Sequence, residues 1–446
     1  MKKAIRWFSA SPPRTLLIGF AFIIFAGAQL LRLPIATVSR ESMSFVDALF
    51  TATSATCVTG LVLFDTGSHF STFGHWVILL LIQIGGIGFM TMATLFALIL
   101  RRRISLKERL ILQESLNQGS IEGLVRLVRK VIFYALALET AGAILYSIRF
   151  AIDMPLGQAI YHGIFHSISI FNNAGFDLSG DFSSFSKYSA DLYMNIVSMV
   201  LIVLGGFGFI VLADLFEIRK KWKFSLHTKV VLSVSAVLIG FGALIIFIFE
   251  FTNGRSIGDE AFGQKVLMSL FQSVTTRSGG VATVDIAELR QATQFFIIIL
   301  MFIGASPGST GGGIKTTTFA VLVGAVLAMI RGKEDVVLFR LRLAQERVYK
   351  AVTVTLFCIG IVMLGTMVLA TTEDAGFLKI LFEATSAFGT VGLSMGLTAN
   401  LSIAGKLTII FLMFIGRLGP LTLTYALGPK PGRVLYRHAE GKIIIG

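Results

Sequence analysis

The sequence is short of charge and of cysteine. Asp, Glu, Lys and Arg make up 14% of its 446 residues, whereas soluble domains carry about a quarter. That shortage excludes an ordinary soluble protein. The two cysteines, Cys57 and Cys358, are too few for a scaffold held together by disulfides. Intrinsic disorder is excluded as well, because 54% of the residues are hydrophobic and 39 of them are Phe.

The chain has instead apolar stretches long enough to cross a bilayer, which takes about 20 residues. The first of them, residues 16–31, follows a basic segment as the apolar region of a secretory signal does. It is slightly too long for that role, and no small-x-small cleavage site follows it. We therefore predict a multi-pass membrane protein whose first span is retained.

Lys and Arg outnumber Asp and Glu by 39 to 25, which gives a net charge of +14. Of the 39, 27 lie in five clusters between the apolar stretches: residues 2–14, 101–130, 219–229, 331–350 and 430–442. Short basic loops stay cytoplasmic, so we expect all five clusters and both termini on the cytoplasmic side of the cell membrane. The distribution favours contact with lipid headgroups and argues against a nucleic-acid partner.

Four segments of the chain resemble one another: residues 49–61, 164–176, 270–281 and 381–393. Each is a short stretch with Phe as its second residue and glycine as its last residue but one. The spacing from Phe to Gly is 10 residues in three copies and 9 from Phe271 to Gly280, and the sequence leaves open whether Gly279 or Gly280 is the third equivalent. The stretches are too short and too polar to span. We expect re-entrant helices, which a membrane tolerates only where they face protein or water.

A second glycine signature follows each of these segments inside an apolar stretch, at residues 84–90, 204–210, 303–315 and 415–421. The repeated unit is therefore span, re-entrant segment, span. The expected outer spans are residues 16–31, 131–148, 230–251 and 352–369, and the expected inner spans are residues 76–100, 192–216, 295–330 and 406–427.

The predicted fold class is an all-α membrane protein. It has four parallel repeats, with eight transmembrane helices and four pore helices around one pseudo-fourfold pore. The repeats occupy residues 1–100, 101–217, 218–332 and 333–446, and the third contains a broken inner helix.

The re-entrant stretches end in the segments TCVTG, FNNAG, TRSGG and FGTVG. A ring of carbonyl oxygens replaces the hydration shell of a monovalent cation. Glycine permits the positive dihedral angles that turn carbonyls inward, and the C-terminal dipole of the preceding helix favours cations. Because the four segments differ, we expect fewer well-formed ion sites than in a fourfold-symmetric channel. The residues predicted to form the filter and bind K⁺ are Thr56, Cys57, Val58, Thr59, Gly60, Asn172, Asn173, Ala174, Gly175, Arg277, Ser278, Gly279, Gly280, Gly389, Thr390, Val391 and Gly392.

The third inner span is interrupted. Five glycines and a proline lie within residues 304–313, and these residue types break a helix. Irregular backbone at that depth must line a cavity, so we predict a gating loop over residues 304–318, with a plain hinge or packing defect as the alternative. The predicted gate residues are Gly304, Ala305, Ser306, Pro307, Gly308, Ser309, Thr310, Gly311, Gly312, Gly313, Lys315 and Arg417.

Arg417 lies in the middle of the fourth inner span, where a charge is costly and normally faces a partner or water. Its expected partners are carbonyls or hydroxyls of residues 304–318, so that it latches the closed loop and repels K⁺. Structural pairing without gating is the alternative. Lys315 is a weaker candidate for the same task, since its side chain has the length to extend toward the cytoplasm.

FGTVG resembles the TVG core of potassium-channel filters. With its four filter loops, eight predicted spans and interrupted third inner span, the full chain is similar to the KtrB/TrkH family of potassium transporters, and to KtrB in particular. The resemblance implies a homodimeric, channel-like K⁺ uptake subunit with one pore per protomer and a cytosolic, nucleotide-binding KtrA-like regulatory ring. It also implies stimulation by Na⁺, filter glycines at Gly60, Gly175, Gly280 and Gly392, and an intramembrane gating loop with an arginine.

Other residues give weaker evidence for a functional site. His162 and His166 lack a third metal ligand nearby, so we expect no metal besides K⁺. Four acidic residues are expected near the outer mouth, where they either concentrate cations or form a solvated rim: Asp47, Asp177, Asp285 and Glu383. No nucleophile, base and orienting group occur together, so we expect neither an enzyme nor an organic cofactor.

Three functions remain in competition. The first is passive, gated K⁺ conduction, with Na⁺ as an activator. The second is the ion-binding subunit of an ATP-driven K⁺ pump, whose energy would come from a partner because the chain has no DKTG motif. The third is a secondary transporter of an organic substrate, which usually shows inverted repeats, whereas the repeats here are parallel.

Overall fold

The computed structural model describes residues 12–88, 91, 106–115, 124–221 and 224–419. Within them the protein is helical, apart from one short hairpin formed by β1 (Val337–Leu338) and β2 (Leu341–Arg342). Both chain ends, most of the basic clusters at residues 2–14 and 430–442, and the ends of the first and fourth predicted inner spans lie outside the described residues.

Four long helices coincide with the predicted outer spans. They are α2 (Pro12–Leu31), α8 (Leu124–Phe150), α12 (Leu226–Glu250) and α16 (Gln345–Thr372). In the described part of the chain, these four are long and apolar enough to cross a membrane, or five spans if the bent pair α10 and α11 counts as one. Eight spans therefore stay a prediction.

Each glycine-ended segment follows a short buried helix, as predicted: α3 (Phe45–Thr56), α9 (Leu156–Phe171), α13 (Phe262–Thr275) and α17 (Phe377–Gly389). The hydroxyl of Ser44 accepts a hydrogen bond from the Asp47 amide and so caps the start of α3. All four helices stop at the polar segment, with 12 to 16 residues, too few to cross a bilayer.

The inner helices end where the second glycine signature occurs. They are α5 (Thr72–Ile87), α10 (Leu192–Phe207), α14 (Gln291–Phe302) and α18 (Ile403–Leu418). Gly88, Gly208 and Gly419 follow three of these helices with φ of +90°, +86° and +81°, which a right-handed helix does not accommodate.

The predicted second inner span, residues 192–216, is not one straight helix. After Gly208 the chain resumes as α11 (Phe209–Lys221), and the two helices meet at an angle of 105°. The two helices together still satisfy the length and hydropathy of a span, but the bend at Gly208 was not predicted from the sequence.

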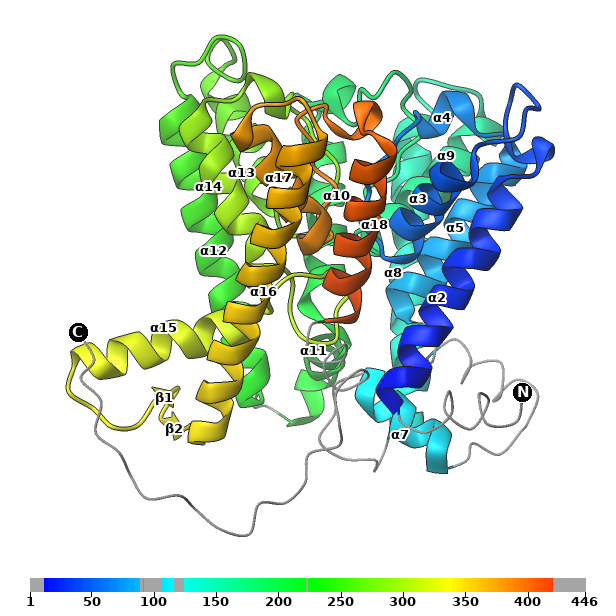
Figure 1. The fold of residues 1–446 in the computed structure, drawn as a ribbon. Coiled ribbons are helices and arrows are strands. Elements are labelled where there is room, and N and C mark those ends of the chain that lie inside the picture. The colour runs from blue at the N-terminus through cyan, green and yellow to red at the C-terminus, as the bar shows by residue number, and fades with distance from the viewer. Residues whose placement is uncertain (1–11, 89–90, 92–105, 116–123, 222–223, 420–446) are drawn as a thin grey trace.

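The third inner helix is broken, as the glycine run predicts. The chain leaves α14 at Phe302, and α15 (Thr316–Ile330) begins after the loop. Figure 1 shows α15 running out sideways at the end of the bundle where β1 and β2 lie. The remaining short elements are α4 (Thr66–His69), α7 (Leu106–Ser115), η1 (Pro34–Ala36), η2 (Ser186–Tyr188), η3 (Ile286–Glu288) and η4 (Thr398–Asn400).

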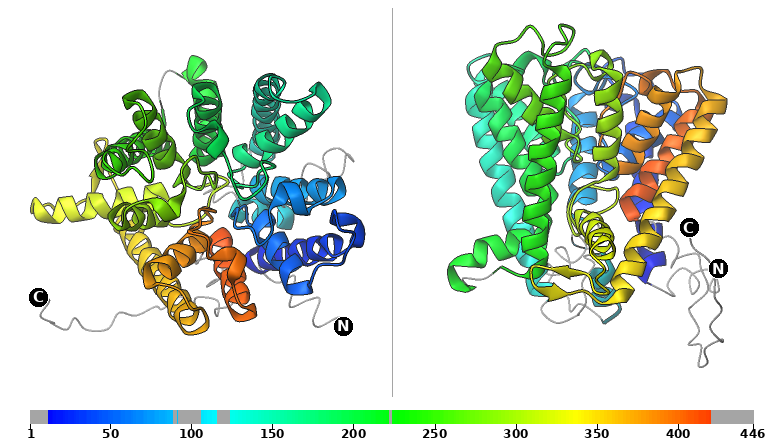
Figure 2. Two further views of the ribbon diagram at one scale, coloured as in Figure 1. Left: turned by 90° about the horizontal axis from the view of Figure 1, so that it is seen from above. Right: turned by 90° about the vertical axis from the view of Figure 1, so that its left-hand side faces the viewer.

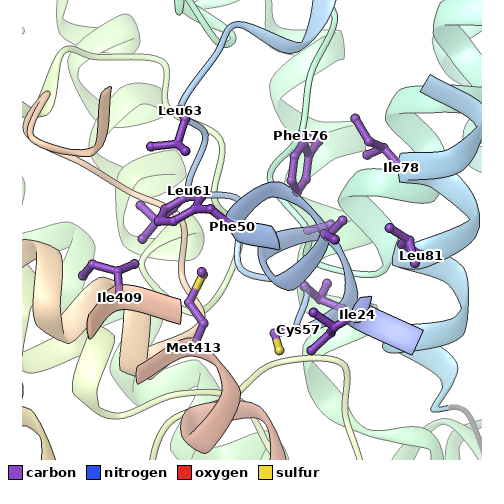
Figure 3. Packing of buried hydrophobic residues seen from close by; sticks show 14 of the residues in the cluster. Ile24, Phe50, Cys57, Leu61, Leu63, Ile78, Leu81, Phe176, Ile409 and Met413 are labelled. Carbon is purple, nitrogen blue, oxygen red and sulfur yellow. The ribbon is translucent and has the colours of Figure 1, made fainter. Parts of the chain in front are cut away.

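The chain passes around the bundle in sequence order, so that α2 and α18 end up as neighbours, both in contact with α3 (Figure 2, left). The largest core cluster surrounds α3, where Phe50 is fully buried (Figure 3). Ile24 of α2, Leu81 of α5 and Met413 of α18 belong to the same cluster. This packing joins the first and last quarters of the chain.

Candidate functional site

The four glycine-ended segments meet one another. A Cβ atom added to Gly60 would lie 3.1 Å from the Cα of Gly175, and one added to Gly175 would lie 2.7 Å from the Cα of Gly280. One added to Gly392 would lie 3.1 Å from the Cα atoms of both Gly280 and Gly60. The four glycines therefore form a closed ring in sequence order, too narrow for any larger residue.

All four segments share one backbone pattern. The ring glycines have φ between +69° and +91°. The residue two positions before each glycine is also left-handed, and these residues are Val58 (+58°), Asn173 (+58°), Ser278 (+72°) and Thr390 (+48°). A backbone that enters the left-handed region at alternate residues turns successive N–H groups to one side and leaves the carbonyls on the other. The pattern selects Gly280, not Gly279, as the third equivalent.

Serine side chains hold two of these segments to their own helices. The Gly60 amide donates a hydrogen bond to the Ser54 hydroxyl, with an N to O distance of 3.2 Å. The Gly392 amide donates in the same way to the Ser386 hydroxyl, also at 3.2 Å. In both copies the serine lies six residues before the glycine, so the first and fourth segments have matching supports.

The spacing from Phe to Gly differs between the second and third copies, and their hydrogen bonds show why. The Ser169 hydroxyl donates to the carbonyl of Phe176, the residue after the ring glycine, at 2.6 Å. In the third copy the Thr275 hydroxyl donates to the equivalent carbonyl, that of Val281, at 2.5 Å. Thr275 in the third copy therefore has the role of Ser169 in the second copy, but it lies one residue closer to the ring glycine. This difference of one residue accounts for the shorter Phe to Gly spacing in this copy.

The second glycine signatures bring the inner helices against the ring segments. A Cβ added to Gly85, Gly205 or Gly416 would lie 1.8, 1.9 or 1.9 Å from the carbonyl oxygen of Thr56, Phe171 or Phe388, respectively. Each of these carbonyls belongs to the first residue of its five-residue segment. Only glycine permits such an approach. In the third copy the equivalent glycine, Gly304, faces the carbonyl of Gly312 in its own loop.

The loop between α14 and α15 folds back on itself and bonds to the break between α10 and α11. An isolated bridge joins Ile303 to Ile314. The Ser306 amide donates to the Gly206 carbonyl at 3.0 Å, and the Phe209 amide donates to the Gly308 carbonyl at 3.0 Å. The breaks in the second and third inner helices therefore support each other, which explains why α10 does not run on.

Arg417 joins this loop to two inner helices. Its guanidinium donates hydrogen bonds to the carbonyl oxygens of Thr310 and Gly85, and a longer one, 3.2 Å, to that of Gly86. No carboxylate forms an ion pair with Arg417 in the part of the chain that the structure describes. A half-buried cation is thus held by backbone carbonyls, among them one from the loop where the sequence had placed its partner.

Lys315 also bonds to the loop. Its ammonium group donates to the carbonyl oxygen of Gly311 at 2.5 Å and lies 3.5 Å from that of Gly312. The alternative in which Lys315 extends toward the cytoplasm is therefore wrong, because the ammonium group turns back to its own loop.

Not every side chain of the predicted filter faces the ring. Cys57 is fully buried in the hydrophobic cluster around α3 (Figure 3). The Arg277 side chain lines a small cavity beside α10 and α12, of about 10 Å³, and its Nε has no hydrogen-bond partner among the described residues. As side chains, neither of these two residues fits the predicted role of K⁺ ligand. Their backbone carbonyls remain candidates.

Sequence reasoning missed Glu139, which lies on α8 behind the second segment. Its carboxylate accepts hydrogen bonds from the amides of Asn172 (2.8 Å) and Gln83 (2.9 Å), and Asn172 also donates to Gln83 at 3.1 Å. Glu139 is buried. The signal was present, because Glu139 is the one charge in the predicted span 131–148, and an acid inside a membrane span is by default a candidate functional residue.

The predicted outer acids do not form one group. Asp47 pairs with Lys406 at 2.7 Å, and Asp285 accepts the Ala287 amide at the start of η3. Glu383 is fully buried and bonds to the hydroxyls of Ser394 and Thr398. Glu383 therefore does not belong to a solvated rim, because its buried carboxylate joins α17 to the segment that follows the ring.

The histidine pair supports the second segment from outside. The Leu178 amide donates to Nε2 of His166 at 3.3 Å, and Nδ1 of His166 bonds to the carbonyl of His162 at 2.8 Å. Both ring nitrogens of His166 are therefore engaged with backbone. Asp177, between the ring and Leu178, accepts the Ser179 amide at 2.9 Å.

The chain is similar to known proteins over nearly its whole length. The chain is 44% identical over 444 residues to the Ktr system potassium uptake protein B of Bacillus subtilis, covering 100% of this chain and 99% of that protein. It is 39% identical to the potassium/sodium uptake protein NtpJ of Enterococcus hirae, covering 100% of this chain and 99% of the relative. A Ktr system potassium uptake protein B from Vibrio alginolyticus is 38% identical over 97% of this chain and 95% of its own.

A solved structure shares the fold. The crystal structure of the potassium transporter TrkH from Vibrio parahaemolyticus superposes with a TM-score of 0.73, at 18% identity, over 93% of this chain and 84% of that one. A family model described as TrkH, cation transport protein, matches residues 9–429. This protein therefore belongs to the TrkH family of membrane cation transport proteins.

Proposed function

We propose that this protein takes up K⁺ across the cell membrane by gated, passive conduction, driven by the membrane potential. The closed ring of Gly60, Gly175, Gly280 and Gly392 is the observation that carries the proposal. The names of its relatives support the choice of ion, since three of them are potassium or potassium/sodium uptake proteins.

In the proposed architecture, four parallel repeats of span, pore helix and span surround one pore. It is supported by four copies of the same order: a long helix, a short buried helix, a left-handed glycine segment and an inner helix. The ends of the predicted first and fourth inner spans, residues 76–100 and 406–427, lie outside the described residues. Both termini and the basic loops would then lie in the cytoplasm.

Selectivity would come from backbone groups rather than from carboxylates. Each ring segment follows the C-terminal end of a short helix, where the helix dipole places partial negative charge. Carbonyl oxygens of the segments would replace the hydration shell of K⁺. The first and fourth segments are supported through the amide of the ring glycine, and the second and third through the carbonyl of the residue after it, so we expect unequal ion sites and modest discrimination against Na⁺.

The gate would be the loop predicted over residues 304–318, whose last residues form the start of α15. It bonds to the α10 break and to the fourth ring segment, where the Gly312 amide donates to the Thr390 hydroxyl at 2.8 Å. A loop held in that place obstructs the path on the inner side of the ring. Arg417 would latch it closed through Thr310 and add a positive charge that repels cations.

The partners in this proposal are inferred from the protein's relatives. The name Ktr system indicates a transporter of more than one component, and we propose a homodimer regulated by a cytosolic, nucleotide-binding KtrA-like ring. The name of the Enterococcus relative, a potassium/sodium uptake protein, supports Na⁺ as an activator. We propose no organic cofactor in this chain.

Uptake of radioactive Rb⁺ by liposomes tests the proposal. Liposomes containing the full chain alone, without nucleotide and with an inside-negative potential, should accumulate Rb⁺, and excess K⁺ should block the uptake. The alternative, an ion-binding subunit of an ATP-driven K⁺ pump, predicts no accumulation without ATP and a partner. Empty liposomes under the same potential provide the background.

A further inference from the structure

Three consecutive loop residues meet three consecutive ring segments. The Thr310 hydroxyl lies 3.1 Å from the side-chain oxygen of Asn173, in the amide orientation that satisfies both ends of that side chain, and 3.2 Å from the Gly205 carbonyl oxygen, so its one proton is shared between two acceptors. A methyl group added to Gly311 would lie 2.6 Å from the Ser278 hydroxyl. The Gly312 amide donates to the Thr390 hydroxyl. Loop order and ring order therefore match.

Asn173, Ser278 and Thr390 occupy the same position, two residues before the ring glycine, and all three have a positive φ. Each brings an oxygen, from an amide or a hydroxyl. The fourth member of this level is Val58, which brings none. We call Asn173, Ser278 and Thr390 the inner oxygen level. All three residues are fully buried.

The loop presents its amide edge to this level because its carbonyls are bound elsewhere. The carbonyl of Gly311 accepts a bond from Lys315, and the N–H of the same peptide, that of Gly312, donates to Thr390. A trans peptide points these two groups in opposite directions. The carbonyl of Thr310 is bound in the same way by Arg417. Lys315 and Arg417 thus hold carbonyl groups of the loop on one side, so that peptide N–H groups of the loop face the ring.

The hydrogen of an amide N–H carries a partial positive charge. When it bonds to an oxygen, it occupies a lone pair that a bound cation would otherwise use. Hydroxyl and amide oxygens are ordinary ligands of monovalent cations, and a hydroxyl that accepts the Gly312 amide has one lone pair fewer for an ion. A cation and the loop therefore cannot both be fully coordinated at this level. The two are alternatives for the same oxygens.

We propose that the inner oxygen level is a K⁺ site that the closed loop occupies in place of the ion, so that K⁺ and the loop compete for it. This inference rests on the proposed function, since it places the site on the K⁺ path. Its consequence is that K⁺ itself promotes loop release. By reciprocity, a released loop raises the affinity of the site for K⁺ by the same factor.

Accessibility of the loop measures the competition. Ser309 lies in the loop, and its hydroxyl donates only to the Ser306 carbonyl among the described contacts, at 2.6 Å. In the S309C variant of the full chain in liposomes, a maleimide reagent should modify the introduced thiol faster as K⁺ replaces N-methyl-D-glucamine at constant ionic strength. We expect about a fivefold rise, the low end of typical coupling between ligands. Mass spectrometry of the peptide containing position 309 separates this thiol from the native, buried Cys57 and Cys358.

Adding T390V to S309C removes the acceptor of the Gly312 amide. Modification should then be fast without K⁺ and respond little to it. A matched control adds T366V instead, because Thr366 is a buried threonine whose hydroxyl, among the described residues, bonds only within its own helix, to Val362. It should keep the K⁺ dependence. Equal K⁺ dependence in the T390V and T366V variants would overturn the inference.

The S309C measurement on the native ring stands even if T390V does not fold. Modification that is independent of K⁺, in liposomes that still take up Rb⁺, overturns the competition and leaves the proposed function standing. Liposomes that take up no Rb⁺ under any condition overturn the proposed function itself. Modification that rises with K⁺ and Rb⁺ but not with N-methyl-D-glucamine supports the inference.

Discussion

The guanidinium of Arg417 on α18 donates a hydrogen bond to the carbonyl of Gly85 on α5, 332 residues earlier in the sequence. Gly85 is also the residue whose missing side chain lets α5 approach Thr56 in the first ring segment. The same guanidinium binds Thr310 of the loop. One side chain therefore connects the fourth inner helix, the first inner helix and the loop beneath the ring.

Replacing Arg417 with alanine should open the loop. The loop loses one hydrogen bond from a charged donor, worth about 1.5–3 kcal/mol, so we expect passive Rb⁺ influx to rise about ten- to a hundredfold. R417K should lie between the two, because an ammonium group reaches the carbonyls without the planar fork of a guanidinium. K406A is the control. It removes a cation from the outer end of the same helix, where Lys406 pairs with Asp47, and should produce no such rise.

Shortening the loop should increase influx further. Deleting residues 308–312 removes the carbonyls that Arg417 and Lys315 bind and the amide that Thr390 accepts. A deletion of residues 339 and 340, in the turn between β1 and β2, provides the comparison because that turn lies far from these contacts in the sequence. If influx stays at the wild-type rate in both R417A and the 308–312 deletion, the loop is not the gate.

The ring glycine of the fourth segment should tolerate no side chain. In G392S the new Cβ would lie 2.3 Å from the Thr59 carbonyl oxygen, at a residue with φ of +91°. We expect a higher KM for K⁺ or a lower preference for K⁺ over Na⁺, measured by competition against Rb⁺ influx. G396S separates the two causes, because Gly396 also has a positive φ (+77°) but nothing within 4 Å of an added Cβ. Unchanged K⁺ kinetics in G392S would contradict the filter assignment.

The close approach of the inner helices should be a condition of stability. In G205A the added Cβ would lie 1.9 Å from the Phe171 carbonyl oxygen, so the helix and the second segment must move apart. Overpacking of this kind costs about 1–3 kcal/mol, and we expect a lower midpoint of thermal unfolding in detergent. G240A, at a helix position where an added Cβ meets nothing within 4 Å, should melt no lower than wild type. Equal midpoints for the two variants would refute the packing role.

Glu139 should matter for ion affinity because it supports the second ring segment. E139Q replaces one carboxylate oxygen with an NH2 group, which cannot accept a hydrogen bond from the side-chain amides of Asn172 and Gln83. The second segment therefore loses its support. We expect a several-fold higher KM for K⁺ in the Rb⁺ influx assay. E373Q is the matched control, because Glu373 makes its bonds to Ser402 at the outer end of α18. An E139Q protein with wild-type KM would reduce Glu139 to a packing role.

Much of this arrangement followed from the sequence because it repeats. Four similar segments identified the short helices and three of the ring glycines, and the glycine run predicted the break after Phe302. The bend at Gly208 was missed because its cause lies elsewhere in the chain: the loop supplies the Gly308 carbonyl that the Phe209 amide needs. No local pattern reports such a partner.

Single side chains were harder to place than segments. Cys57 and Arg277 lie within the ring segments in sequence, yet their side chains turn away from the ring, because a left-handed backbone reverses direction at alternate residues. The choice between Gly279 and Gly280 also required dihedral angles, since a threonine had taken the place of a serine one residue away. Glu139 was visible as a lone acid, but its partner Asn172 was not.

Anomalous scattering from crystals grown in Rb⁺ or Cs⁺ tests the central claim most directly, because it locates the ion without a model of its ligands. The account predicts a peak inside the ring of Gly60, Gly175, Gly280 and Gly392, bounded by carbonyl oxygens of all four segments. Peaks only at the protein surface or in other cavities, with the ring empty, would contradict it.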